Sequence, residues 1–230
     1  MRIGIIGAMS VEVESLKNKL ADARHETVSG IEFHIGTLYG KDTVIAQCGI
    51  GKVFAAICAQ TMLIRFGVTH VINTGVGGTL TDKLDLLDVA IADGVVQHDM
   101  DTSPLGDPVG LISGINKVVL PTSKALREIA KQAADELGIN ALAGIIASGD
   151  QFISKAEKKR FITESFSAIC CEMEGAAIGH VCYVGGAECL IVRAISDSAT
   201  GDAQMEYPRL VAKAAEQSQK MIEKIFMLLK

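Results

Sequence analysis

Residues 168–197, AICCEMEGAAIGHVCYVGGAECLIVRAISD, decide the fold class of this chain. The run Ala168–Met173 is almost wholly apolar and predicts a strand, Gly175–Tyr183 predicts a helix, and Glu188–Ile195 predicts a second strand. Two strands joined by a helix are typical of a parallel pair with a crossover connection. Continuous apolar strands of this kind favour a sheet that is covered on both faces.

The same alternation continues through most of the chain. We expect strands at residues 2–7, 69–73, 87–92 and 141–148, a hairpin or meander at 26–40 and 42–48, and helices at 53–66, 121–137 and from 206 to the end. Residues 99–115 contain two prolines and three glycines, which predicts an exposed loop. The sequence therefore predicts a single α/β domain over residues 1–230, with a twisted, mixed and mostly parallel sheet flanked by helices on both faces.

Local signals also predict where individual helices begin and end. A helical pattern after the first strand extends through Leu16 to Leu20. Pro121 is expected to start the helix that runs to residue 137. Ser154 and Glu157 have the spacing of a capping box at the start of a short helix.

Composition argues against several classes of partner. Hydrophobic residues make up 49% of the 230 residues and charged residues 21%, which is an ordinary globular balance. Lys and Arg number 22 against 27 for Asp and Glu, so the net charge of −5 disfavours nucleic acid and anionic membranes as partners. No apolar run approaches the roughly 20 residues of a membrane-spanning helix. We expect a cytoplasmic protein that binds a small molecule.

The sequence predicts neither a disulfide framework nor a metal centre. Most of the six cysteines lie in apolar strand or helix patterns, none has C-x-x-C spacing, and the five histidines are scattered. Gly4 and Gly7 match only a fragment of a dinucleotide-binding loop, without its third glycine or its later acidic residue. We therefore expect reduced, buried thiols and no cofactor.

Five polar or glycine-rich clusters follow apolar strands. They are Met9–Glu12, Thr74–Gly78, Gly149–Ile153, Glu172–Glu174 and Arg193–Asp197. In an open α/β sheet, ligands bind beyond the carboxyl ends of the strands, so these clusters are candidates for one site.

Each cluster also has a structural explanation. The glycines of Thr74–Gly78 either bring the backbone close to a ligand or form a tight turn. Glu172 and Glu174 share one face of the strand if the strand persists that far. The structural alternative is that they are solvated acids at the strand end, or that Glu174 is an acid near the start of the next helix. Arg193–Asp197 is compatible with an ordinary polar turn.

Taken in order, the clusters resemble the bacterial 5′-methylthioadenosine/S-adenosylhomocysteine nucleosidases of the nucleoside phosphorylase superfamily. The resemblance covers essentially the whole chain. It is strongest at residues 4–9 with Glu12, 49–53, 73–75, 148–153, 172–174 and 193–197.

The resemblance implies hydrolysis of the N-glycosidic bond of methylthioadenosine, adenosylhomocysteine and 5′-deoxyadenosine, as in methionine salvage. Asp197 matches the general acid that protonates adenine N7, and Glu12 matches the residue that activates water. Glu174 matches the residue that holds the ribose hydroxyls and stabilises the cationic sugar. An acid at position 12 disfavours phosphate as the nucleophile, because like charges repel at short range.

The resemblance also implies further contacts with the nucleoside. Substrate-binding residues by this comparison are Met9, Gly78, Phe152, Ile153, Met173, Glu174, Arg193 and Ser196, with Arg193 and Ser196 supporting Glu174 and Asp197. Ile50, Leu105 and Tyr207 are candidates for the pocket around the 5′ substituent. Family members are homodimers, so we expect a second copy of the chain to complete this pocket.

Two departures from the family pattern bear on the choice of substrate. Val76 stands where a small hydroxyl residue is usual, and the loop at 99–115 is poor in the aromatic residues that often cover the 5′ group. An aminofutalosine-type nucleoside hydrolase, a nucleoside phosphorylase and a non-catalytic nucleoside-binding protein remain as alternatives.

Overall fold

The structure, a computed structural model, describes residues 1–197 and 207–229, with the backbone alone at 207 and 208. Its strands are β1 Ile3–Gly7, β2 Ala21–Val28, β3 Ile31–Leu38, β4 Lys41–Gln47, β5 His70–Thr79, β6 Val89–Gln97, β7 Leu120–Pro121, β8 Ala141–Ser148, β9 Ala168–Glu172 and β10 Glu188–Asp197. Its helices are α1 Ser10–Lys17, α2 Lys52–Phe66, α3 Lys124–Leu137, α4 Ala156–Phe166, α5 Gly175–Gly185 and α6 Tyr207–Leu228, with a 3₁₀ turn at Ser103–Leu105.

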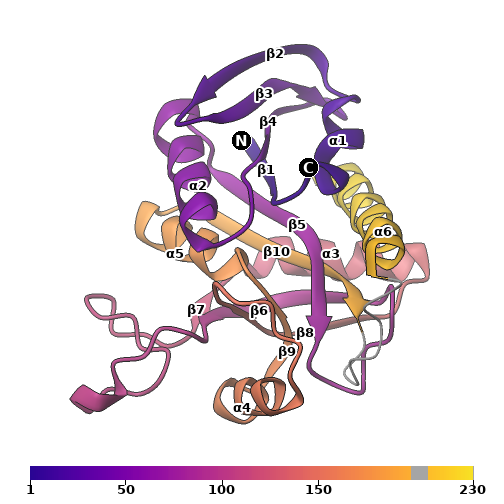
Figure 1. The fold of residues 1–230 in the computed structure, drawn as a ribbon. Coiled ribbons are helices and arrows are strands. Elements are labelled where there is room, and N and C mark those ends of the chain that lie inside the picture. Colours follow the sequence, from indigo (N-terminus) through magenta and orange to yellow (C-terminus); the bar gives the residue numbers. More distant parts are fainter. Residues whose placement is uncertain (198–206, 230) are drawn as a thin grey trace.

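The strands form one mixed sheet in the order β10-β6-β8-β9-β5-β1-β4-β3-β2, with β7 paired to β6. β10 also pairs with β5, so β5, β9, β8, β6 and β10 close into a ring from which β1 to β4 extend (Figure 1). The long strands β5 and β10 pair in parallel, and their carboxyl ends lie at the same edge. The predicted mixed α/β sheet is confirmed.

Helices cover both faces of this sheet, as predicted. α2 and α5 pack on one face, and α1, α3 and α6 pack on the other (Figure 1). α4 covers β8 and β9 over a smaller third cluster. All six cysteines are buried free thiols. No helix within residues 1–197 or 207–229 has the length and apolarity needed to cross a membrane.

Several predicted boundaries were wrong. α1 ends at Lys17, although Leu20 is still buried beyond it. α3 begins at Lys124 because the Ser123 side chain caps the helix by accepting a hydrogen bond from the Leu126 amide. The expected capping box before α4 is absent: α4 begins at Ala156, after Lys155, with no side-chain cap.

The largest difference concerns β5, which runs to Thr79 rather than ending near residue 73. Its glycine-rich second half continues the ladder, because Gly75 and Gly77 pair with β10 and Gly78 pairs with both β10 and β9. Tertiary pairing therefore makes a strand of a stretch that local propensity reads as a turn.

The packing of α6 generates a first prediction. Phe226 is 1% exposed within the cluster on that face, whereas its neighbour Met227 is 64% exposed. Phe226→Ala should lower the free energy of unfolding by about 3–5 kcal/mol, because it leaves a cavity. Met227→Ala is the matched control and should change it by less than about 0.5 kcal/mol. Urea denaturation measures both, and equal effects would contradict the assigned faces of α6.

Candidate active site

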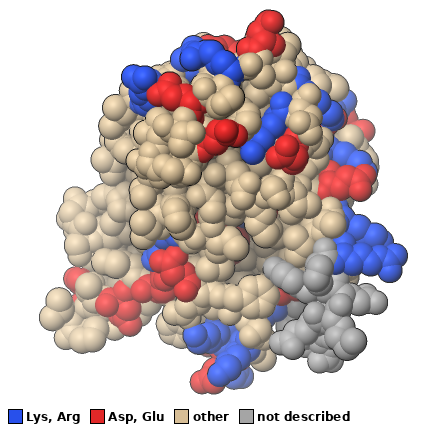
Figure 2. Space-filling view, turned by 45° about the horizontal axis from the view of Figure 1, so that its top comes forward, with Lys and Arg blue, Asp and Glu red and all other residues tan. Residues whose placement is uncertain are grey.

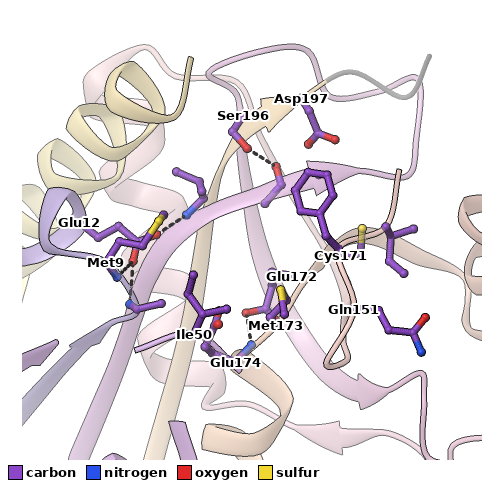
Figure 3. Close-up of a pocket in the computed structure, with 16 residues that line it drawn as sticks. Met9, Glu12, Ile50, Gln151, Cys171, Glu172, Met173, Glu174, Ser196 and Asp197 are labelled. Carbon is purple, nitrogen blue, oxygen red and sulfur yellow. Dashed lines mark hydrogen bonds between the residues drawn. The ribbon is translucent and has the colours of Figure 1, made fainter. Parts of the chain in front are cut away.

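A pocket opens at the carboxyl ends of β1, β5, β8, β9 and β10 (Figure 3). Its volume is about 680 Å³ when the space at its open mouth is included. The lining residues are Ala8, Met9, Glu12, Ile50, Val76, Gly77, Gly78, Gln151, Phe152, Ile153, Cys171, Glu172, Met173, Glu174, Ser196 and Asp197.

Glu12 lies in the first turn of α1 and is held by backbone amides. Its Oε2 accepts hydrogen bonds from the amides of Ala8 and Met9 at 2.7 and 2.9 Å, and its Oε1 accepts one from Val76 at 3.2 Å. Burial raises the pKa of Glu12, although these hydrogen bonds and Arg193 oppose the rise. The result is a fixed carboxyl group that can take up a proton.

An ion pair between Glu172 and Arg193 lies beneath the pocket. Arg193 is 1% exposed, and its guanidinium donates to Glu172 and to the Asn73 side chain. Glu172 also accepts from the Ser148 hydroxyl and from the amides of Glu174 and Gly175. A buried carboxylate with this many donors is well satisfied, and it fixes the start of α5.

Glu174 precedes α5 and points into the pocket. Its Oε1 accepts a hydrogen bond from the Gly51 amide at 2.9 Å. Gly51 has a φ of +101°, which favours glycine at this turn before α2. Burial and the nearby Glu172 raise the pKa of Glu174 to about 7, although Arg193 opposes the rise.

Asp197 ends β10 on the opposite side of the pocket. Its carboxylate lies so close to β5 that a Cβ atom at Gly78 would be 2.7 Å from Oδ1. The ammonium group of Lys159 in α4 is 3.5 Å from Oδ2. Burial raises the pKa of Asp197, and Lys159 opposes that rise. Ser196, the residue before it, donates to the Gly77 carbonyl at 3.5 Å.

Ten of the thirteen residues singled out from the sequence line this pocket: Met9, Glu12, Ile50, Gly78, Phe152, Ile153, Met173, Glu174, Ser196 and Asp197. Arg193 does not line it, because its side chain lies behind Glu172 and supports the floor. Leu105 is 83% exposed in its loop and is not a lining residue. Tyr207 begins α6, but its side chain lies outside the described residues.

The structure adds residues that sequence reasoning missed. Gln151 and Cys171 line the pocket, and Ser148 and Asn73 hold the ion pair beneath it. Lys159 was missed because it lies in a helix rich in charged residues, and the sequence does not distinguish one buried lysine from the exposed charged residues around it. Glu172 and Glu174 do not share a strand face, because β9 ends at Glu172.

Comparison with known proteins identifies the family of this chain. The sequence profile of the Phosphorylase superfamily matches residues 2–227. The chain belongs to this superfamily. The 5′-methylthioadenosine/S-adenosylhomocysteine nucleosidase of Shewanella frigidimarina is 38% identical over 96% of this chain and 97% of its own length. The aminodeoxyfutalosine nucleosidase of Helicobacter pylori is 36% identical over 96% of both chains.

Solved structures of this superfamily have the same fold. The Helicobacter pylori 5′-methylthioadenosine/S-adenosylhomocysteine nucleosidase, in complex with a pyrrolopyrimidine-substituted pyrrolidinol, superposes with a TM-score of 0.94 at 36% identity. The superposition covers 100% of this chain and 99% of that one. The predicted membership among the nucleosidases of this superfamily is thus confirmed.

The raised pKa of Glu174 predicts a pH-dependent stability. Its folded-state pKa of about 7 exceeds the ordinary value of 4.5, so ionised Glu174 weakens the fold as the pH rises between these values. Glu174→Gln should therefore raise the free energy of unfolding at pH 8 by on the order of 2 kcal/mol, and by little at pH 4. Urea denaturation at both pH values measures this difference.

Glu14→Gln is the matched control, because Glu14 is exposed on α1. It should show no such divergence between pH 4 and pH 8. Parallel stability curves for wild type and Glu174→Gln would contradict the raised pKa.

Proposed function

We propose that this protein hydrolyses the N-glycosidic bond of 5′-methylthioadenosine and S-adenosylhomocysteine, and of 5′-deoxyadenosine as a further substrate. The observation that carries the proposal is the convergence of Glu12, Glu174 and Asp197 in one pocket beside Phe152 and Ile153. The carboxyl groups come from three distant segments of the chain. The activities of the relatives described above support the same reaction.

Asp197 is the general acid in this proposal. Adenine leaves readily only when its ring is protonated, and a carboxylic acid near N7 supplies that proton. The raised pKa of Asp197 favours the protonated form at higher pH than for an ordinary aspartate. Its position beside Gly78 presents the acid to the pocket, next to the segment of Phe152 and Ile153 that would hold the base.

Glu12 activates the attacking water, and Glu174 holds the ribose. The three backbone donors on Glu12 fix its carboxyl group while leaving it in the pocket lining, as a general base requires. Glu174 is a second carboxylate, which can accept hydrogen bonds from the ribose hydroxyls, and its charge would stabilise an oxocarbenium-like sugar. Met9, Met173 and Ser196 line the same space.

The lining also favours water over phosphate as the nucleophile. Among the described lining residues four are acidic and none is Lys or Arg. A phosphate anion would require cationic donors there, and it would be repelled by Glu12. This disfavours the phosphorylase alternative.

An aminodeoxyfutalosine-type substrate is the second candidate. It is supported by the Helicobacter pylori relative of that name, which aligns along nearly the whole chain. The scissile bond has the same chemistry, and the difference lies in the group on the 5′ carbon. Kinetic comparison of the four nucleosides decides between them, and the substrate with the highest kcat/KM defines the activity.

We further propose that the protein acts as a cytoplasmic homodimer, with one nucleosidase domain per chain and a role in methionine salvage. Apolar side chains are exposed in α2, at Val53 and Ile64, and just before it, at Ile50. They support a dimer contact beside the pocket. Figure 2 shows a broad area without charged side chains across one face of the molecule. Tyr207 remains a proposed contributor to the 5′ pocket, and Leu105 would contribute from the second copy of the chain.

Adenine release is the test of the reaction. Incubation with methylthioadenosine in phosphate-free buffer should release adenine and free methylthioribose at a rate that added phosphate leaves unchanged. Release that depends on phosphate would assign a phosphorylase instead. Binding without release of any of the four nucleosides would assign a non-catalytic role.

Substitution of the proposed acid and base separates their roles. Asp197→Asn and Glu12→Gln should each lower kcat at least about 100-fold, because each removes a proton-transfer group. Both should still bind methylthioadenosine in calorimetry. Glu14→Gln, outside the pocket on the same helix as Glu12, should keep wild-type kcat. Near-normal turnover in either active-site variant would remove that residue from the mechanism.

A further inference from the structure

Lys159 occupies an inward position of α4 where packing favours an apolar side chain. The buried residues of this helix are Lys159, Ile162 and Phe166, which share one face at the spacing i, i+3 and i+7. Lys159 is 6% exposed, whereas its neighbours Lys158 and Arg160 are exposed. A lysine is seldom buried this deeply unless it is paired, since removal of its charge from water is costly.

The carboxylate of Asp197 is a charged group that faces Lys159. The distance from Nζ to Oδ2 is 3.5 Å. The same carboxylate lies close to Gly78 of β5, where a Cβ atom would be 2.7 Å from Oδ1 and 3.1 Å from Oδ2. The other titratable groups near Asp197 among the described residues are the thiols of Cys170 and Cys171 in β9. Burial raises the pKa of both thiols, so they are neutral at pH 7.

We propose that Lys159 is a positioning residue for Asp197, which orients the carboxyl group and stabilises the negative charge it acquires during the reaction. This inference rests on the proposed function. When the N-glycosidic bond breaks, its electron pair leaves with adenine, the proton of Asp197 passes to N7, and Asp197 becomes a carboxylate. Water supplies the hydroxyl group at the anomeric carbon, and the proton that it loses passes to Glu12. An ammonium group at 3.5 Å favours the carboxylate over the acid and therefore favours this transfer.

The same contact determines the pH range of activity. Burial raises the pKa of Asp197 and Lys159 lowers it, so the two effects oppose each other. A general acid works only while it is protonated, and kcat falls as the pH rises through its pKa. Removal of the ammonium group should therefore weaken the acid and, at the same time, keep it protonated to higher pH.

The test is the pH profile of kcat for Lys159→Met, Lys159→Arg and Arg160→Met. Lys159→Met keeps an unbranched apolar chain in the buried position and should lower the maximal kcat by about tenfold or more. It should also move the alkaline limb of the profile upward by about one pH unit or more. Lys159→Arg keeps the charge and should restore the wild-type limb. Arg160→Met removes an exposed cation from the same helix and should change neither quantity.

The controls separate this inference from the proposed function. Absence of hydrolysis by the wild-type protein, or full activity of Asp197→Asn, would contradict the proposed function. If wild type hydrolyses the substrate and Asp197→Asn is inactive, the profile of Lys159→Met decides the role of Lys159. An alkaline limb of the kcat profile at the wild-type pH would overturn that role, even if kcat or stability fell. If Lys159→Met fails to fold, Lys159→Gln replaces it. An alkaline limb of the Lys159→Gln profile that coincides with that of Lys159→Arg would also overturn the role of Lys159.

Discussion

The buried ion pair between Arg193 and Glu172 is the interaction on which the rest of the site depends. It joins β10 to the end of β9, and through Asn73 and Ser148 it reaches β5 and β8. Asn73 also donates to the Ile6 carbonyl of β1. A buried ion pair is costly unless its remaining polar atoms are satisfied. Here the Ser148 hydroxyl and the amides of Glu174 and Gly175 satisfy the carboxylate, whereas Nε of Arg193 has no hydrogen-bond partner among the described residues. Residues of five strands are thereby joined beneath the pocket.

The geometry of the ribose side follows from this floor. Glu172 accepts hydrogen bonds from the amides of Glu174 and Gly175, which places the start of α5 and directs the Glu174 side chain into the pocket. Glu174 in turn accepts from the Gly51 amide at the start of α2. A series of hydrogen bonds thus connects Glu172 in the core to the start of α5 and then to the start of α2, which covers the same face of the sheet as α5. Such fixed donors need little rearrangement when charge develops in a ligand.

The glycines of β5 serve the other side of the pocket. A Cβ atom at Gly75 would be 2.7 Å from Oε1 of Glu12, and one at Gly78 would be 2.7 Å from Oδ1 of Asp197. Two carboxyl groups from different segments therefore rest directly on one strand. Their burial against it contributes to the raised pKa values of both. The glycines provide close approach in a strand, and they are not needed here for a turn.

The sequence by itself determined the α/β class, most strands and helices, and the clusters that meet in the pocket, because apolar periodicity and strand-end polarity are local properties. It did not determine that β5 continues through Thr74–Gly78, since that depends on pairing with β9 and β10. Nor did it distinguish Arg193 as a support beneath the floor, or Lys159 as the cation beside Asp197. The desolvation and the pairing of a charged side chain depend on neighbours that are distant in the chain, so only the tertiary structure decided them.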